Sequence, residues 1–154
     1  MPADRGPRFS YSYVFIDGLF EGRDWTQLHS IVREGILRRA FGATTVTRFL
    51  TRAAQGDEVR RELRDAIVAG RSWKRRVADK SPLSAAELQR MTQIGEVIRE
   101  ARRIYSGDVD AAERFLTAPH RRLGNRSPIL VAADEGGSQA VRELLARLEE
   151  GAPA

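Results

Sequence analysis

The sequence predicts an all-helical protein with one short strand near its N-terminus. Along most of the chain apolar residues recur at spacings of three and four, and helix-capping residues precede these stretches. Only one stretch alternates with a period of two. The chain has 154 residues, of which 42% are hydrophobic and 31% charged. These values are ordinary for a folded domain and allow one sizeable domain or two small ones sharing a core.

The period-two stretch lies near the start of the chain. Phe9, Tyr11, Tyr13 and Phe15 alternate with smaller residues, which predicts a strand over residues 9–16. Because no second strand is predicted, its backbone groups need a partner from elsewhere. Another protein, or no stable pairing, is possible, but we favour pairing between two copies in a homodimer.

Four helices are predicted between residues 24 and 80. Each follows a capping residue or a glycine stop and carries apolar residues three or four positions apart. On the last of them, Trp73 and Val77 are four residues apart, and we expect them to form its buried side. In chain order, the predicted helices run from Asp24 towards Phe41, from Thr44 or Thr45 to Ala53, from Asp57 to near Gly70, and from Arg71 to Ala78.

The clearest helix start is at Ser84. Ser84 and Glu87 form the sequence pattern of a capping box, in which each side chain accepts a hydrogen bond from the other residue's backbone N–H. Leu83 and Leu88 flank this box at the positions of a hydrophobic staple. A single apolar stripe follows and ends at Gly107, so a long helix is expected. The stripe consists of Leu88, Met91, Ile94, Ile98, Ala101 and Tyr105.

Three shorter helices are predicted in the remainder. One starts after Asp108, and Ser127 precedes a proline that suits the first position of another. We expect Asp134 to cap the last helix and Gly151 to end it. The apolar stripe of this last helix consists of Val141, Leu144, Leu145 and Leu148.

Positive charge is concentrated in the first half of the chain. Residues 1–80 contain 16 Lys and Arg against 10 Asp and Glu, whereas residues 81–154 contain 10 against 11. This asymmetry favours contact between the first half and a polyanion such as nucleic acid. A solvated, arginine-rich surface is the alternative interpretation.

Two short helices joined near Gly70 have the arrangement of a helix-turn-helix, with a basic row on the second helix. Arginine can bind guanine edges and lysine can hold phosphates, so DNA is the predicted ligand. Alternatively, these cations pair with Glu62, Asp65 or Asp79 on a solvated face. The candidate DNA-binding residues are Arg71, Ser72, Lys74, Arg75, Arg76 and Lys80.

Other classes of function find little support in the composition. The absence of cysteine excludes disulfides and thiolate chemistry and favours a cytoplasmic location. We expect neither export nor a membrane span, since no signal-peptide core or long apolar run is present. His29 and His120 lack ligand spacing, and no glycine loop suits a phosphate. We therefore predict no metal, no cofactor, no catalytic residue and no enzymatic activity.

Residues 108–151 carry an ordered pattern that helix formation alone does not explain. It runs from Asp108 through Ala-x-x-Phe-Leu, a proline, Leu-Gly-Asn-Arg-Ser-Pro and Gly-x-x-x-Val to Gly151. This pattern strongly resembles the toxin-binding domain of Xre/MbcA/ParS-type antitoxins. A weaker resemblance to the same family extends upstream to residue 56. The signature residues are Ala112, Phe115, Leu116, Pro119, Leu123, Gly124, Arg126, Pro128, Gly137 and Val141.

Three features depart from the family pattern. Phe115 stands where the family prefers Trp, and either ring fills a large volume, so we expect the packing to survive. Asn125 replaces a glycine, and asparagine tolerates a left-handed backbone better than other residues with a side chain. Ala132 and Ala133 stand where bulkier or acidic residues are usual, which leaves the packing there open.

The resemblance implies a fold and a domain organisation. The fold is an Xre-like helix-turn-helix region followed by a small helical toxin-binding domain. We accordingly predict an N-terminal extension over residues 1–23, a DNA-binding region over 24–83, and a toxin-binding and dimerisation domain over 84–154.

The resemblance also implies a function. Such a protein is a homodimeric antitoxin that binds its own promoter or operator DNA and sterically neutralises a RES-type toxin, which is similar to ADP-ribosyltransferases and acts on NAD. The alternatives are a stand-alone helix-turn-helix regulator without a toxin, or an adaptor. The implied toxin-binding residues are Arg142, Glu149, Glu150, Gly151 and Ala154.

Overall fold

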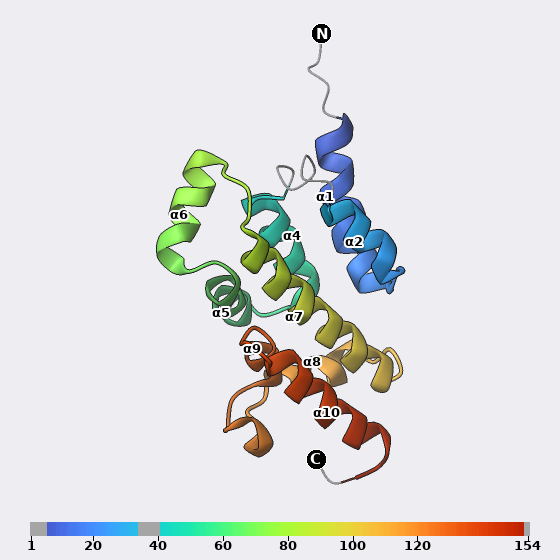
Figure 1. Ribbon diagram of the computed structural model, residues 1–154. Coiled ribbons are helices and arrows are strands. Elements are labelled where there is room, and N and C mark those ends of the chain that lie inside the picture. The colour runs from blue at the N-terminus through green and yellow to red at the C-terminus, as the bar shows by residue number, and fades with distance from the viewer. Residues whose placement is uncertain (1–5, 34–40, 153–154) are drawn as a thin grey trace.

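The computed structural model describes residues 6–33 and 41–152, which form a helical fold (Figure 1). Beside the helices, these residues contain only an isolated bridge between His120 and Arg126. The predicted all-helical class is confirmed. The elements are α1 (Gly6–Glu21), α2 (Trp25–Arg33), α4 (Ala43–Ala53), α5 (Asp57–Ile67), α6 (Gly70–Asp79), α7 (Ala85–Ile104), α8 (Val109–Thr117), the 3-10 turn η1 (Arg121–Leu123), α9 (Pro128–Val131) and α10 (Gly137–Glu149).

The long helix α7 is the centre of the molecule. The predicted capping box starts it: Ser84 Oγ accepts a hydrogen bond from Glu87 N at 3.2 Å, and Glu87 Oε2 accepts one from Ser84 N at 2.7 Å. Met91, Ile94 and Ile98 on its stripe are fully buried. Helices α1, α4 and α5 pack on α7, and α8, α9 and α10 pack on it as well (Figure 1). One hydrophobic core therefore extends across both halves of the chain.

A helix, α1, occupies the region for which the sequence predicted a strand over residues 9–16. Phe15, Ile16 and Leu19 on this helix are fully buried, a spacing that suits a helix packed on one side. Gly95 of α7 allows the close approach, because a Cβ there would lie 2.4 Å from Leu19 Cδ2. Packing against α7 thus favours a helix at Phe15, Ile16 and Leu19, and pairing between two copies stays a prediction.

Some helix limits differ from those predicted. Asp24 caps α2 through a 2.9 Å bond from Thr26 N to its carboxylate, as predicted, whereas the proposed continuation towards Phe41 includes residues 34–40, which lie outside the described residues. Gly42 precedes α4 as its N-cap, and the Thr45 hydroxyl accepts a bond from Gly42 N at 3.0 Å. At this position the threonine side chain reaches back to the cap, so the helix begins earlier than predicted.

Candidate functional sites

The predicted basic helix pair corresponds to α5 and α6, which lie on one edge of the molecule (Figure 1). Val68 and Ala69 are the only residues between them. Within the described ranges, four cations on and after α6 are exposed and have no ion-pair or hydrogen-bond partner. They are Arg71, Lys74, Arg75 and Lys80.

The inward side of α6 differs from the predicted Trp73/Val77 face. Trp73 is partly buried, with the Arg64 guanidinium 5.6 Å from the centroid of its ring. Val77, however, is 52% exposed, and α6 contains no buried residue at all. Arg76 turns towards α7 in its place, because a carboxylate there offers the guanidinium an ion pair that valine cannot make. The sequence pattern placed Arg76 with the basic row on the outer face of α6, and the structure corrects that assignment.

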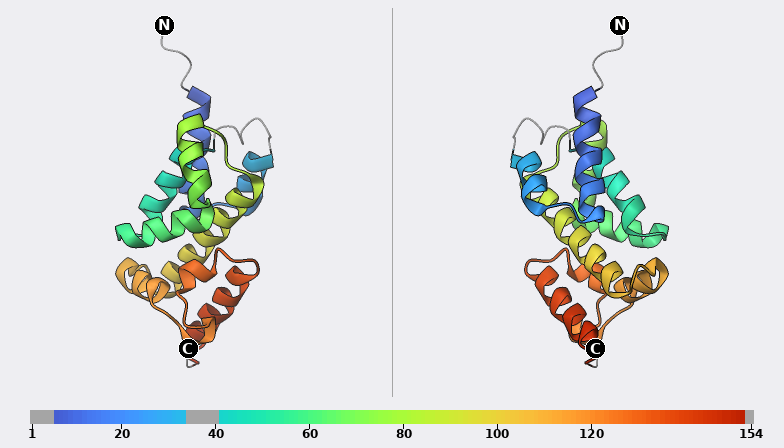
Figure 2. Two further views of the ribbon diagram at one scale, coloured as in Figure 1. Left: turned by 90° about the vertical axis from the view of Figure 1, so that its left-hand side faces the viewer. Right: turned by 90° about the vertical axis from the view of Figure 1, so that its right-hand side faces the viewer.

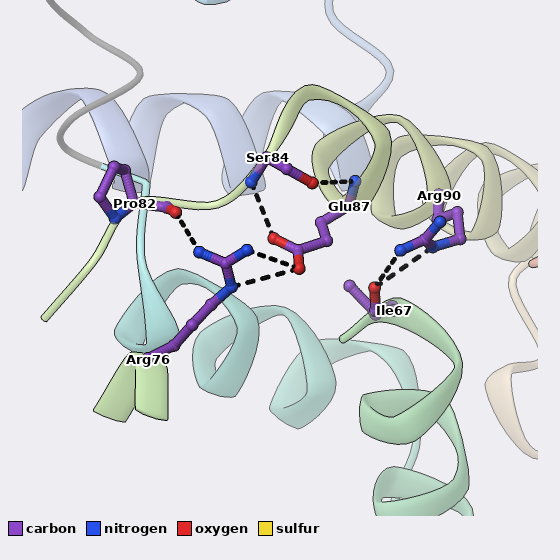
Figure 3. A network of polar contacts seen from close by, with 6 residues as sticks. All are labelled: Ile67, Arg76, Pro82, Ser84, Glu87 and Arg90. Atoms are coloured by element: carbon purple, nitrogen blue, oxygen red, sulfur yellow. Dashed lines mark hydrogen bonds and ion pairs between the residues drawn. The ribbon is translucent and has the colours of Figure 1, made fainter. Parts of the chain in front are cut away.

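Arg76 is held by a compact polar network (Figure 3). Its Nε and Nη2 donate to Glu87 Oε1 at 3.2 and 2.8 Å, and its Nη1 donates to the Pro82 carbonyl at 2.5 Å. The Arg76 and Glu87 side chains are only 14% and 8% exposed. Nearby, Arg90 donates to the Ile67 carbonyl, at the C-terminal end of α5, from Nε and Nη2 at 3.2 and 2.8 Å.

Glu87 was recognised from the sequence only as a capping residue. Its second role, as the partner of Arg76, has no local signal because the two residues are eleven positions apart in different helices. The alternative partners considered from the sequence were Glu62, Asp65 and Asp79. Of these, Asp65 pairs with Arg64, its neighbour in the chain.

The C-terminal signature first forms a tight loop between α8 and α9. His120 N donates to the Arg126 carbonyl at 3.1 Å and closes the loop. Gly124 and Asn125 both have a left-handed backbone, with φ values of 65° and 60°. This confirms that asparagine at position 125 adopts the turn for which the family uses glycine.

Several other signature residues pack this region together, whereas Pro119 is exposed. Ala112, Leu116, Pro128 and Val141 are buried, and Leu123 is half-buried. The other departures from the family pattern are also accommodated, Phe115 by ring contacts and Ala132 and Ala133 by burial.

Phe115 is half-buried, and its ring centroid lies 5.9 Å from that of Tyr105 and 6.3 Å from that of His120. The expected packing of this smaller ring is therefore confirmed. Ala132 and Ala133, whose packing the sequence left open, are both buried.

Gly137 fixes the start of α10. A Cβ at Gly137 would lie 1.8 Å from the Val131 carbonyl oxygen, so only glycine allows this approach of backbone to backbone. The helix begins here, after Gly136, and Asp134 is not its cap as predicted. The Asp134 carboxylate instead forms an ion pair with Arg126, which joins the two ends of the segment around α9.

Helix α10 buries one side of its surface against α7. Val141, Leu144 and Leu145 are buried, as the stripe predicted. Arg142 forms an ion pair with Glu96 of α7. It also lines a shallow polar depression of about 340 Å³ with Glu96, Arg99 and Glu100.

The last turn of α10 forms a second ion pair with α7. The Arg103 guanidinium donates to Glu149 Oε1 and Oε2 at 2.9 Å each and also to Glu100. Hydrogen bonds from Arg103 lower the pKa of Glu149 and of Glu100, and the bonds to both carboxylates, foremost Glu100, raise the pKa of Arg103.

Of the implied toxin-binding residues, two are therefore engaged within the chain and two are open to solvent. Arg142 and Glu149 are in ion pairs with α7. Glu150 and Gly151 are exposed. Ala154 lies outside the described residues.

Two other kinds of feature, a metal site and a membrane-spanning helix, find no support in the described residues. Among the residues that the structure describes, no group of three His, Asp or Glu side chains is placed to hold a metal ion. No helix within the same residues is both long and apolar enough to cross a membrane.

Comparison with known proteins supports the C-terminal signature. Residues 100–151 match the antitoxin Xre/MbcA/ParS C-terminal toxin-binding domain. The chain is 34% identical over 89 residues to an antitoxin Xre from Photorhabdus laumondii, covering 58% of this chain and 60% of that protein. It is 27% identical over 88 residues to an antitoxin Xre from Pseudomonas putida, covering 57% of this chain and 55% of that protein. The chain thus spans somewhat over half the length of these relatives.

Proposed function

We propose that this chain, which matches the antitoxin Xre/MbcA/ParS C-terminal toxin-binding domain over residues 100–151, is an antitoxin of that family that neutralises a co-encoded toxin by direct binding and represses its own operon. The observation that carries the proposal is the match to a toxin-binding domain, whose signature residues fold here into one packed unit with α10 on its surface. Neutralisation by binding requires no catalytic group, so we propose a non-enzymatic protein acting in the cytoplasm.

The partner implied by the resemblance is a RES-type toxin acting on NAD. We propose that the outer side of α10 and the residues after it cover the toxin's cofactor cleft. Glu150 supports this assignment, because its carboxylate is exposed and pairs with no other described residue. The Glu150 carboxylate can therefore contact the cations of a nucleotide-binding cleft without breaking an ion pair within the chain. Glu149 would first have to leave Arg103.

Ending the chain after Glu149 tests this contact. The shortened chain keeps the Arg103–Glu149 pair and the buried stripe, so it should fold and still lose most of its ability to suppress NAD consumption by the co-expressed toxin. Asp110→Asn is the matched control, since this exposed acid lies on α8, outside the proposed contact surface. Full suppression by the shortened chain would rule out the proposed cover.

We propose that α6 contacts operator DNA through its exposed cations. Arg71, Lys74 and Arg75 fall on one side of the helix, and none has an acidic partner among the described residues. A basic row without partners is available to phosphates and base edges. Homodimer formation, which would place two such rows on a symmetric operator, belongs to the same proposal.

Salt-dependent binding to the chain's own promoter fragment tests this surface. Each phosphate contact contributes a slope of about −0.9 to the dependence of log K on log salt, so Arg75→Gln should weaken binding and make the slope shallower by about that amount. Arg147→Gln is the matched control, because Arg147 is an equally exposed arginine on α10. Equal binding by wild type and Arg75→Gln would contradict the DNA surface.

A stand-alone transcription regulator is the second candidate, favoured by the same free cations on α6. It differs from the antitoxin in needing no protein partner. Co-purification with the product of the adjacent gene separates the two, because only an antitoxin forms a stable complex that silences an NAD-consuming activity.

A further inference from the structure

We propose that Glu87 is the positioning residue of the DNA-contacting helix, and that Arg76 anchors α6 to α7 through it and does not itself bind DNA. This inference rests on the proposed contact between α6 and operator DNA. It assigns to Glu87 and Arg76 roles that the basic pattern of α6 does not indicate.

Helix α6 is weakly packed. It contains no buried residue, and Val77, its expected apolar anchor, is half exposed. Trp73 supplies only a partly buried ring. A helix of this length gains most of its stability from a buried apolar side, which α6 lacks. Its orientation on the body therefore depends strongly on polar contacts.

The Arg76 guanidinium is already engaged within the chain. All three guanidinium nitrogens already donate, two to Glu87 and one to the Pro82 carbonyl. The side chain is also mostly shielded from solvent. A bidentate contact with a phosphate or a guanine would compete with this shielded ion pair, and its loss would leave a carboxylate without its partner.

The start of α7 holds both α5 and α6 (Figure 3). Glu87 uses one carboxylate oxygen to cap α7 at Ser84 N and the other to hold Arg76. One turn later, Arg90 holds the C-terminal end of α5 at the Ile67 carbonyl. The first two turns of α7 thus contact both members of the helix pair and set their relative placement.

The sign of the effect of removing the Glu87 charge distinguishes positioning from simple electrostatics. A carboxylate near DNA repels the phosphates, so neutralising an acid that has no structural role should leave binding unchanged or tighten it. Neutralising Glu87 should instead weaken binding, because the charge-assisted bonds to Arg76 become neutral ones. Glutamine still supplies the capping-box acceptor for Ser84 N, so Glu87→Gln spares the start of α7.

The experiment compares Glu87→Gln with Glu62→Gln in binding to the promoter fragment. Glu62 is an exposed acid of α5 without a partner among the described residues, and its neutralisation removes the same charge. We expect Glu87→Gln to lose about threefold to tenfold in affinity with an unchanged salt slope, and Glu62→Gln to bind as wild type or more tightly. Equal or tighter binding by Glu87→Gln would overturn the inference.

A measurement without DNA separates this inference from the proposed function. Hydrogen exchange of the α6 amides should become faster in Glu87→Gln, while exchange in α10 stays as in wild type. Unchanged exchange in α6 would overturn the inference even if DNA binding were established. If wild type fails to bind the promoter fragment, the DNA proposal fails, and the exchange of α6 still decides whether Glu87 holds this helix.

Discussion

Helices α6 and α10 each carry a proposed contact surface, yet they are attached to the body in opposite ways. They lie at opposite ends of the molecule, with α7 between them (Figures 1 and 2). Helix α10 buries Val141, Leu144 and Leu145 and uses its ion pairs with α7 only at the rim. Helix α6 has no buried residue, only the partly buried ring of Trp73, and the shielded Arg76–Glu87 ion pair joins it to α7.

This difference in attachment indicates which kinds of substitution each surface tolerates. Apolar burial is non-directional and shared among several residues, so α10 should keep its place when one rim contact is lost. A shielded ion pair depends on two particular side chains, so α6 should respond to the loss of either. Three further predictions test this contrast, in order of decreasing effect.

The largest effect is expected from truncating the buried stripe. Leu145→Ala should destabilise the protein by about 2 to 5 kcal/mol, because it removes a fully buried side chain and leaves a cavity. The matched change on α6, Val77→Ala, should alter stability by less than about 0.5 kcal/mol, since this side chain is largely in solvent. Urea unfolding followed by circular dichroism measures both, and similar losses would contradict the contrast.

The first residue of each helix offers a second test, since both are glycines. Gly137→Ala should cost about 1 to 3 kcal/mol, because the new Cβ meets the Val131 carbonyl and must push the start of α10 outwards. At Gly70 the nearest atom to a new Cβ is 3.9 Å away, so Gly70→Ala should be neutral or stabilising by up to about 1 kcal/mol. Thermal unfolding measures the stability of both variants. A larger loss of stability in Gly70→Ala than in Gly137→Ala would contradict the contrast between the two helices.

The smallest effect is expected from the rim of α10. Arg103 lowers the pKa of Glu149 in the folded state, so this carboxylate adds stability above its ordinary pKa of 4.5, and the contribution disappears as the pH falls through the lowered folded pKa. The difference in melting temperature between wild type and Glu149→Gln should be small near about pH 6 and vanish near about pH 3. A difference that grows in acid would show that Arg103 does not hold Glu149.

Local signals in the sequence were sufficient for much of the C-terminal half. The capping box at Ser84 and Glu87, the stripe of α10 and the left-handed turn at Asn125 each depend on residues close together in the chain. Such interactions form within one or two turns and leave a readable spacing. The family match to residues 100–151 agrees with the signature found in that half.

Where the sequence misled, partners distant in the chain decided the outcome. Helix α1 packs on α7 where Leu19 meets Gly95, more than seventy positions further along the chain, and the alternating pattern carries no sign of that partner. Likewise, Arg76 rather than Val77 faces inward, because the Arg76 guanidinium pairs with Glu87, which lies in a different helix. A periodicity argument sees only one helix at a time and cannot weigh such partners.

The sequence by itself determined the helical class, the start of α7 and the antitoxin signature, because capping, helical spacing and turn chemistry act locally. The tertiary structure alone decided which charged residues remain available on each surface. The Arg76–Glu87 ion pair forms only once packing brings separate helices together, and a guanidinium so shielded is no longer readily available to DNA.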